Sequence, residues 1–372
     1  MVFSIAVPVY GQSRFLPTAL ASIAAQSAAV QLAVMDATPD DSAQEIVGRY
    51  ATNIHYSRHG ADDGQSDAIQ EGWDRTTGDI VGWLCADDCL FPNALTAVEE
   101  VFRTRPDVDI VYGDGIFIDQ EGRFIRYFPS ISEDVTRITR DCCITQPSCF
   151  VRREAMDRVG GVRRDLHYVM DWDLWTRLHR AGCRFHYLRQ PLSASRMHPG
   201  TKTTGNSNAR AREMWRHLVR YNPTPAALRS MVGVQLAPLV YRELGPNDET
   251  ALGGLTRWAT QIARRFWRSA GREATRTLYG LEIGTNAVRQ RCEIHLPFYG
   301  DSSPTQFVVN TAEKIPLTAA IDGQPLAIAS APSPRQHVFM IPAEFGGRRH
   351  SFRFELDSPA AGAWRLESAQ VQ

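Results

Sequence analysis

The N-terminal part of the chain alternates short apolar runs with stretches in which apolar side chains recur every three or four positions. Runs of that length suit strands, and the recurring spacing is that of a helix with one buried face. We expect strands at residues 3–9, 30–35, 54–56, 79–84 and 109–112, and helices at 16–26, 42–50, 65–75 and 92–104. This alternation predicts an α/β fold with a parallel sheet and helices on both faces.

The pattern becomes mixed after the last of these strands. Residues 146–204 contain one clear helical stretch, over 170–181, which ends at Gly182. Residues 207–278 are mainly helical. Beyond them, short apolar runs alternate with Gly, Pro and Asp, and Asp322-Gly323 is typical of a tight β-hairpin. We therefore predict an α/β domain over 1–204, a helical segment over 205–280 and a β-sandwich-like domain over 281–372.

Composition narrows the class of partner. The 41 basic residues balance 41 acidic ones, so net charge gives no reason to expect nucleic-acid binding. The cysteine count of 7 is odd and lacks a zinc-site spacing, which favours reduced thiols in a cytoplasmic protein. The chain starts directly with a strand pattern rather than a signal peptide, and no apolar run approaches the ~20 residues that span a bilayer.

One stretch is strongly basic. Residues 255–278 carry six Arg against one acid, Glu273, on a helical pattern with Trp and Phe. Such a helix can lie on an anionic membrane surface, so peripheral contact at the inner face of a membrane is one expectation. The other is a helix packed between two domains with a solvated Arg face.

Acidic residues follow two of the expected strands. Asp36 ends the second, and Asp87-Asp88 follows the fourth. Ligands of α/β sheets bind beyond the carboxyl ends of the strands. Paired carboxylates there suit a hard cation, Mg²⁺ or Mn²⁺, which can neutralise a leaving diphosphate. The alternative is that Asp88 caps the helix near Pro92.

Six segments in order resemble the family 2 glycosyltransferases, which have the GT-A fold. The resemblance covers about residues 3–204, and its motifs lie at 7–11, 34–42, 62–72, 77–88, 111–114 and 170–175. This chain departs from the family at Gly11, where members usually have Asn, and at Ala37, where the partner of Asp36 is usually Asp.

The resemblance implies roles by position. Pro8, Tyr10 and Asp36 would contact the nucleotide base, and Ala37 lacks the carboxylate that the family usually has beside Asp36. Asp88 would bind the metal. The remaining donor contacts would come from Asp63, Asp67 and Asp87. Asp67 fits equally well as a stabilising acid in the first turn of a helix.

The family inverts the sugar's anomeric centre, which requires a general base for the acceptor hydroxyl. Asp171 matches that position, and Asp173 is the competitor. Two residues along a helix are about 200° apart, so the two cannot share one face. Either could instead be a helix N-cap.

Further roles are expected near these residues. In the family an Arg-x-His, here Arg196 and His198, closes over the diphosphate, and the His can bind the metal. Lys202 could meet phosphate, and residues 201–207 could order as a lid. Of the Trp residues that could stack on sugars, we favour Trp172 for the acceptor; the others are Trp73, Trp83 and Trp175.

The expected function is therefore metal-dependent, inverting transfer of a sugar from a nucleotide-diphosphate donor to a glycan or lipid-linked glycan, in surface polysaccharide or lipopolysaccharide synthesis. A non-catalytic nucleotide-sugar or glycan-binding protein is the alternative. A nucleotidyltransferase would need a Gly-rich basic loop after the first strand, and residues 11–14 are too poor in Gly.

Overall fold

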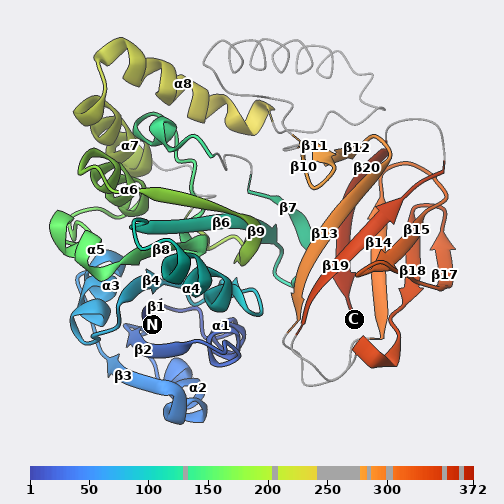
Figure 1. Cartoon of the computed structure of the whole chain (residues 1–372), viewed down its shortest axis with the longest axis horizontal. Coiled ribbons are helices and arrows are strands. Elements are labelled where there is room, and N and C mark those ends of the chain that lie inside the picture. Colours follow the sequence, from blue (N-terminus) through green and yellow to red (C-terminus); the bar gives the residue numbers. More distant parts are fainter. Residues whose placement is uncertain are drawn as a thin grey trace. The chain divides into compact units, whose positions relative to one another are not determined.

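The computed structural model describes residues 1–128, 133–202, 208–240, 277–282, 286–298, 305–345, 350–359 and 364–372 (Figure 1). These residues form two compact units. The first consists mainly of residues 1–120 and 133–217, and the second of 121–128 and most described residues from 218 onward. The expected basic helix at 255–278 lies almost wholly outside the described residues.

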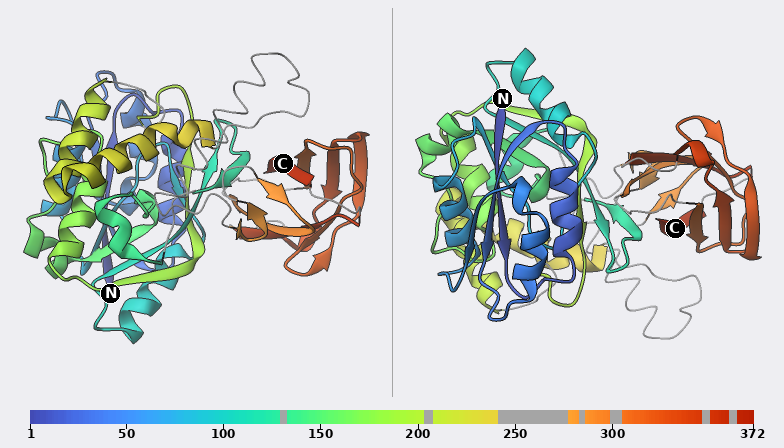
Figure 2. Two further views of the ribbon diagram at one scale, coloured as in Figure 1. Left: turned by 90° about the horizontal axis from the view of Figure 1, so that it is seen from above. Right: turned by 90° about the horizontal axis from the view of Figure 1, so that it is seen from below.

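The first unit is an α/β domain. Its strands are β1 (Val2–Val9), β2 (Ala29–Asp36), β3 (Ile54–His59), β4 (Ile80–Trp83), β5 (Cys89–Leu90), β6 (Ile110–Ile118), β8 (Cys149–Arg152) and β9 (Phe185–Arg196). Its helices are α1 (Leu16–Ala24), α2 (Ser42–Arg49), α3 (Gln65–Asp74), α4 (Ala94–Thr104), α5 (Arg153–Val159), α6 (Met170–Arg180) and most of α7 (Asn208–Tyr221). The helices lie on both faces of the sheet (Figure 2), which confirms the expected fold.

The strand order of this sheet places several strand ends together. It runs β3-β2-β1-β4-β8-β6, and β9 pairs with β6. The strands β1 to β4 are parallel, and β8 is antiparallel to both of its neighbours. The carboxyl ends of β1, β2 and β4 therefore lie at one edge, where the register pairs Val9 with Asp36.

Three tryptophans build the core beside β4. Trp73 from α3, Trp83 from β4 and Trp175 from α6 are all nearly fully buried. Trp83 stacks on Trp175 at 5.5 Å between ring centroids and meets Trp73 edge-on at 5.6 Å. The idea that one of these three stacks on a sugar ring is therefore wrong, because all three rings are buried in the core.

The second unit is mainly antiparallel β structure. Besides α8 (Thr224–Val240), it contains β7 (Phe124–Tyr127), β10 (Thr277–Leu278), β11 (Leu281–Glu282), β12 (Ala287–Val288), β13 (Arg291–Phe298), β14 (Gln306–Thr311), β15 (Thr318–Ile321), β16 (Gln324–Pro325), β17 (Ile328–Ser333), β18 (Gln336–Met340), β19 (His350–Asp357) and β20 (Trp364–Val371). The sheet β13-β19-β15-β16 packs on the sheet that holds β20, β14 and β18, with Phe354 stacked on Phe307. The expected sandwich is confirmed.

Some boundaries differ from those that the sequence predicts. The hairpin at Asp322-Gly323 is present, with both residues at positive φ and Ile321 paired with Gln324. By contrast, no strand was expected over β9, although it is the longest strand among the described residues. The first unit also extends through His217 rather than ending at residue 204, because α7 packs against α6 through Glu213 and His217. Among the described residues, no helix is long and apolar enough to cross a bilayer.

Candidate functional site

Asp87 and Asp88 lie in the turn between β4 and β5. The turn is closed by the Asp88 amide, which donates to the Cys85 carbonyl at 3.0 Å. Both carboxylates are nearly buried, at 6% and 8% exposure. Asp88 does not cap α4, whose N-cap residue is Asn93. Instead its Oδ1 accepts the Arg196 amide at 2.9 Å, so the capping alternative is wrong.

The electrostatics of this turn suit a cation. Burial, together with the charge of Asp87, raises the pKa of Asp88 well above the usual aspartate range, and Arg196 offsets only part of this. One ligand atom each from Cys85, Asp87 and Asp88 lies within 4.8 Å of the others. Carboxylate oxygens at this spacing fit Mg²⁺ or Mn²⁺, and a bound divalent ion would relieve the repulsion.

His198 reaches the same turn from the segment after β9. Its Nε2 lies 3.0 Å from Asp87 Oδ2, and its Nδ1 accepts the Gly200 amide at 3.2 Å. Because Nδ1 is an acceptor, the ring proton is assigned to Nε2, which donates to Asp87. To bind a metal, His198 would have to exchange this hydrogen bond for the ion.

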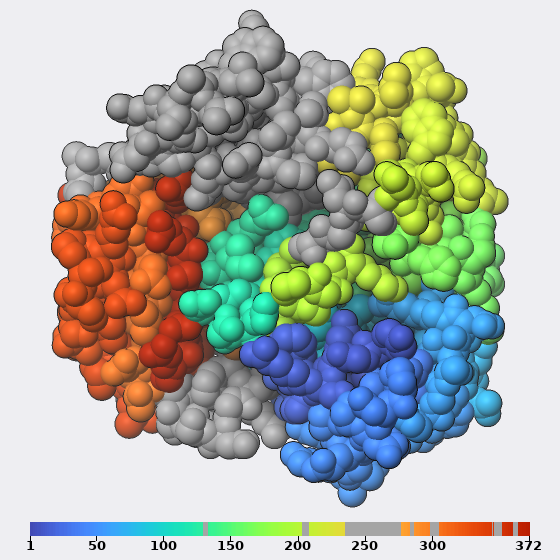
Figure 3. Space-filling view, turned by 180° about the vertical axis from the view of Figure 1, so that it is seen from behind, coloured from blue at the N-terminus to red at the C-terminus, as the bar shows by residue number. Residues whose placement is uncertain are grey.

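Arg196 braces the turn. Its guanidinium donates to the carbonyls of Asp87, Asp119 and Gln120 at 2.9–3.1 Å, and it is 6% exposed. Phe15 packs against it, with 4.8 Å between the guanidinium carbon and the ring centroid. On the face in Figure 3, the yellow-green segment at the end of β9 lies beside the blue N-terminal residues. The Nε and Nη1 groups of Arg196 are thus bound to main-chain carbonyls, and closure of this residue over a diphosphate stays a prediction.

The expected base pocket lies at the ends of β1 and β2. Tyr10 is 69% exposed, Pro8 is buried, and Asp36 is fully buried. Asp36 accepts hydrogen bonds from the Thr38 amide, Gln44 Nε2 and His59 Nδ1 at 2.7–3.1 Å. Burial alone would raise the pKa of Asp36, but these hydrogen bonds outweigh burial and lower it.

Two residues near Asp36 were missed from the sequence, Gln44 and His59. The expected third strand stopped at residue 56, whereas β3 continues to His59 at the same sheet edge as Asp36. The departure at Gly11 has a local reason, because its φ is +65° and this left-handed conformation favours Gly and then Asn.

Asp63 and Asp67 lie before and within the first turn of α3. Asp63 is exposed. Asp67 forms an ion pair with Arg164. The interpretation of Asp67 as a first-turn acid is thus consistent with its position, and a donor contact would compete with Arg164.

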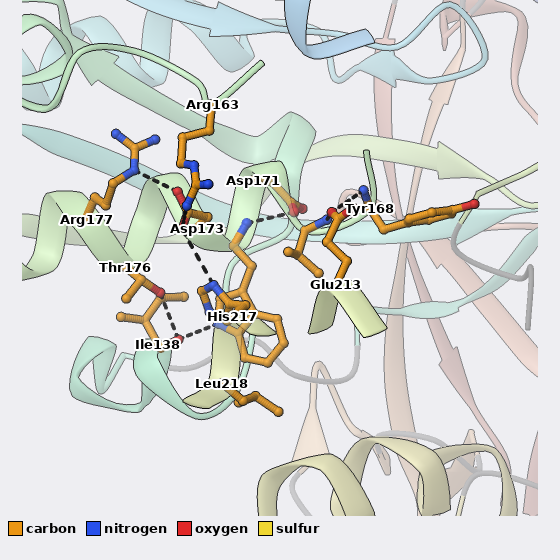
Figure 4. Close-up of polar contacts among 12 residues, drawn as sticks. Ile138, Arg163, Tyr168, Asp171, Asp173, Thr176, Arg177, Glu213, His217 and Leu218 are labelled. Carbon is orange, nitrogen blue, oxygen red and sulfur yellow. Dashed lines mark hydrogen bonds and ion pairs between the residues drawn. The ribbon is translucent and has the colours of Figure 1, made fainter. Parts of the chain in front are cut away.

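Asp171 and Asp173 have different environments at the start of α6 (Figure 4). Asp173 is nearly fully buried and accepts Arg177 Nε at 2.7 Å, with Arg163 at 3.9 Å. Asp171 is partly exposed, and its Oδ1 accepts the amide of Trp172 at 2.7 Å. The N-cap position is Val169, so neither Asp is the N-cap. Burial raises the pKa of Asp171, against the effects of the Trp172 hydrogen bond, His217 and Arg210.

Trp172 is not available to a sugar. It is 4% exposed, its indole N–H donates to the Ile138 carbonyl, and its ring lies 4.5 Å from that of His217. The expectation that Trp172 stacks on the acceptor is therefore wrong, because both the ring and its polar atom are committed to the fold.

Cys85 marks the point where the site residues converge. Burial and the charges of Asp88, Asp87 and Asp171 raise the pKa of its thiol, and Lys202 acts in the opposite direction. All four charged groups therefore lie within electrostatic range of one sulfur. Gln65 links Cys85 to Lys202: its Nε2 donates to Cys85 Sγ at 3.1 Å, and its Oε1 accepts from Lys202 Nζ at 2.8 Å. The site thus combines a carboxylate pair with a separate, third carboxylate.

Comparison with known proteins shows which family and which proteins the chain is similar to. Residues 4–160 match the family model "Glycosyl transferase family 2". The O-antigen biosynthesis protein RfbC of Myxococcus xanthus is 28% identical over 260 residues, which are 64% of this chain and 20% of that protein. A PGL/p-HBAD biosynthesis glycosyltransferase of Mycobacterium tuberculosis is 28% identical over 177 residues, 46% of this chain and 67% of that protein.

The chain spans a minor part of the first of these relatives. An uncharacterized glycosyltransferase of Rickettsia conorii is 25% identical over 57% of this chain, and the match covers 37% of that protein. Among solved structures, S. aureus TarS residues 1–349 in complex with UDP-GlcNAc superposes with a TM-score of 0.50 at 13% identity. That match covers 73% of this chain and 82% of the other. At this identity the likeness concerns the fold.

Proposed function

We propose that this chain, in which residues 4–160 match the model of glycosyltransferase family 2, transfers a sugar from a nucleotide-diphosphate donor to a glycan or lipid-linked glycan acceptor. The observation that carries the proposal is the nearly buried Asp87-Asp88 pair in the turn after β4, where one ligand atom from each and one from Cys85 lie within 4.8 Å of one another. The names of the relatives, O-antigen biosynthesis protein and PGL/p-HBAD biosynthesis glycosyltransferase, support an acceptor in surface polysaccharide synthesis.

The proposed reaction is a single displacement with inversion. The acceptor hydroxyl oxygen bonds to the anomeric carbon, the bond from that carbon to the diphosphate oxygen breaks, and the nucleoside diphosphate leaves. The hydroxyl proton passes to the carboxylate of Asp171. A partly buried carboxylate with a raised pKa suits this role, because its affinity for a proton is closer to what general-base chemistry near neutral pH requires.

Asp173 is a poor candidate for the same step. Both of its oxygens face cations, Arg177 Nε at 2.7 Å and Arg163 at 3.9 Å. Proton uptake would leave these cations without a partner in a buried setting, which costs several kcal/mol in typical proteins.

The diphosphate end of the donor would lie at the β4–β5 turn. Asp88 would hold a divalent cation, Mn²⁺ or Mg²⁺, with His198 as a further ligand; when bound, the cation neutralises charge on the leaving diphosphate. Asp87 would orient the ribose or donor sugar. Lys202, which donates to Gln65 beside Cys85, is a candidate cation for a phosphate oxygen.

The nucleoside would lie at the ends of β1 and β2. Tyr10 offers an exposed ring for the base, next to the buried Pro8. Asp36 would accept a base N–H only by sharing oxygens that already bind His59 and Gln44. Asp63 and Asp67 remain candidate donor contacts.

The test is a panel of nucleotide sugars with Mn²⁺ or Mg²⁺, in which release of nucleoside diphosphate is measured for the wild type and Asp88→Asn. We expect release with one donor class and its loss in the variant. The control is Asp157→Asn, an exposed aspartate on α5, which should behave as wild type. Donor binding without any transfer would instead favour the non-catalytic binding protein. No binding by the wild type would overturn the proposal.

A further inference from the structure

The N-terminus of α6, which carries Asp171, is held by a residue of another helix. Glu213 on α7 accepts three consecutive backbone amides, from His167, Tyr168 and Val169, at 2.7–3.1 Å (Figure 4). These residues immediately precede α6. The helix has no side-chain cap of its own at Val169. Glu213 therefore supplies from α7 the acceptor that an N-cap residue normally provides.

The same face of α7 also contacts the residue after Asp171. Positions 210, 213 and 217 are three and four apart, so they share one side of the helix. His217 packs on Trp172, whose indole N–H is fixed to Ile138. Arg210 is near enough to lower the pKa of Asp171 by its charge. Helix α7 thus contacts the chain on both sides of Asp171: Glu213 binds the amides before it, and His217 packs on Trp172 after it.

The energetics of the Glu213 contacts favour a single geometry. Hydrogen bonds to a carboxylate are roughly twice as strong as neutral ones. An anion at the start of a helix also interacts favourably with the helix dipole. Three such bonds on consecutive amides fix the backbone direction at which α6 begins, and hence the point from which the Asp171 side chain extends.

We propose that Glu213 is a positioning residue for Asp171, holding the start of α6 so that the base meets the acceptor hydroxyl. This inference rests on the proposed function. Among the described residues, Glu213 forms no hydrogen bond with the elements that carry the proposed donor contacts, β1, β2, β4 and α3; α3 instead contacts the neighbouring residues Arg164 and Leu166. Loss of Glu213 should therefore affect the chemical step and spare donor binding.

The variants are Glu213→Ala, Glu213→Gln and the control Glu154→Ala, which removes an exposed first-turn carboxylate from α5. All are made in the full chain. Glu213→Ala should lower kcat by about 10- to 100-fold, the scale of loss expected when a reacting group is displaced by about 1 Å. Glu213→Gln, which keeps an acceptor oxygen, should fall between Ala and wild type. Glu154→Ala should leave kcat unchanged.

Three readouts separate positioning from a merely structural role. Donor KM and the affinity for nucleoside diphosphate should stay at wild-type values in Glu213→Ala. The acid limb of its pH–rate profile should move to lower pH, because a displaced Asp171 gains solvent. Amide hydrogen exchange at residues 167–169 should accelerate.

Two results would overturn the inference. One is faster exchange at residues 167–169 with unchanged kcat and pH profile. The other is a parallel loss of nucleotide affinity, thermal stability and kcat, which is the pattern of general destabilisation. Failure of the proposed function is distinguishable, because it appears in the wild type as absent transfer with every donor.

Discussion

Four carboxylates at or near the site have distinct sets of partners, and these partners decide what each residue can do. Asp36 and Asp173 are saturated by internal donors, so they are suited to holding the fold. Asp88 is bound by one backbone amide and repelled by Asp87. Asp171 accepts the amide of its neighbour Trp172 and keeps some exposure. The pKa values of Asp88 and Asp171 are raised, and to these two residues we assign metal binding and proton transfer.

Removing the charge of Asp171 should remove the base. We expect Asp171→Asn to lower kcat by about 10²- to 10⁴-fold, the usual contribution of a general base. Affinity for nucleoside diphosphate should stay unchanged, as measured by calorimetry. Asp173→Asn provides the comparison, and a larger loss of kcat there than in Asp171→Asn would reverse our assignment.

The pH dependence of kcat follows from the raised pKa of Asp171. The base works only when deprotonated, so the rate should fall as pH drops through a pKa above the ordinary aspartate value. The wild-type profile should therefore have an acid limb at higher pH than an exposed aspartate would give. Asp171→Asn should lack this limb in its residual activity.

Asp88 should weaken the metal-free fold. A carboxyl whose pKa is raised in the folded state binds protons more tightly there than in the unfolded chain, so stability falls as pH rises above the unfolded pKa. In EDTA at neutral pH, Asp88→Asn should raise the thermal midpoint by about 2 °C or more. A lower midpoint for the variant in EDTA would contradict this account, since Asn can still accept the Arg196 amide.

The close packing of α3 on the sheet requires a glycine at position 72. A Cβ at Gly72 of α3 would lie 2.9 Å from Cβ of Ala6 in β1, closer than side chains approach. Gly48 of α2 is exposed, and its added Cβ would meet nothing within 4 Å. A larger side chain is therefore excluded by close contact at Gly72 of α3, whereas Gly48 of α2 has open space for one.

We expect opposite signs for two Gly→Ala changes. Gly72→Ala should lower the free energy of unfolding by about 1–3 kcal/mol, because it overpacks the helix–sheet contact. Gly48→Ala should raise it by about 0.5–1 kcal/mol, because Ala favours helix and the site is open. Denaturant unfolding measures both, and stabilisation by Gly72→Ala would show that α3 can shift away from β1.

Across the full chain, the family match ends within the first unit. Residues 4–160 contain the β4–β5 turn, but Asp171, His198 and Glu213 come later in the chain. The first unit nevertheless continues to His217. Its proposed chemistry therefore depends on α6, β9 and α7, and the second unit contributes no residue to the site as we assign it.

Ligand binding should accordingly stabilise one unit. In scanning calorimetry, nucleoside diphosphate with Mn²⁺ at about 100 times Kd should stabilise the first unit by about 2.7 kcal/mol by mass action. The transition of the second unit should not move. Asp88→Asn should abolish the shift, and a shift confined to the second unit would place the nucleotide site elsewhere.

The order of elements and the strand-end positions of Asp36, Asp87 and Asp88 could be predicted from the sequence. Those features follow from local apolar periodicity, which reports which face of a strand or helix is buried. The same periodicity placed Asp171 at the start of a helix. The partners of these residues emerged only from the folded chain: Arg177 for Asp173, Arg196 for Asp88, His217 for Trp172 and Glu213 for the start of α6. These contacts join residues far apart in the chain or depend on which way a helix faces, and a one-dimensional pattern carries no information about either.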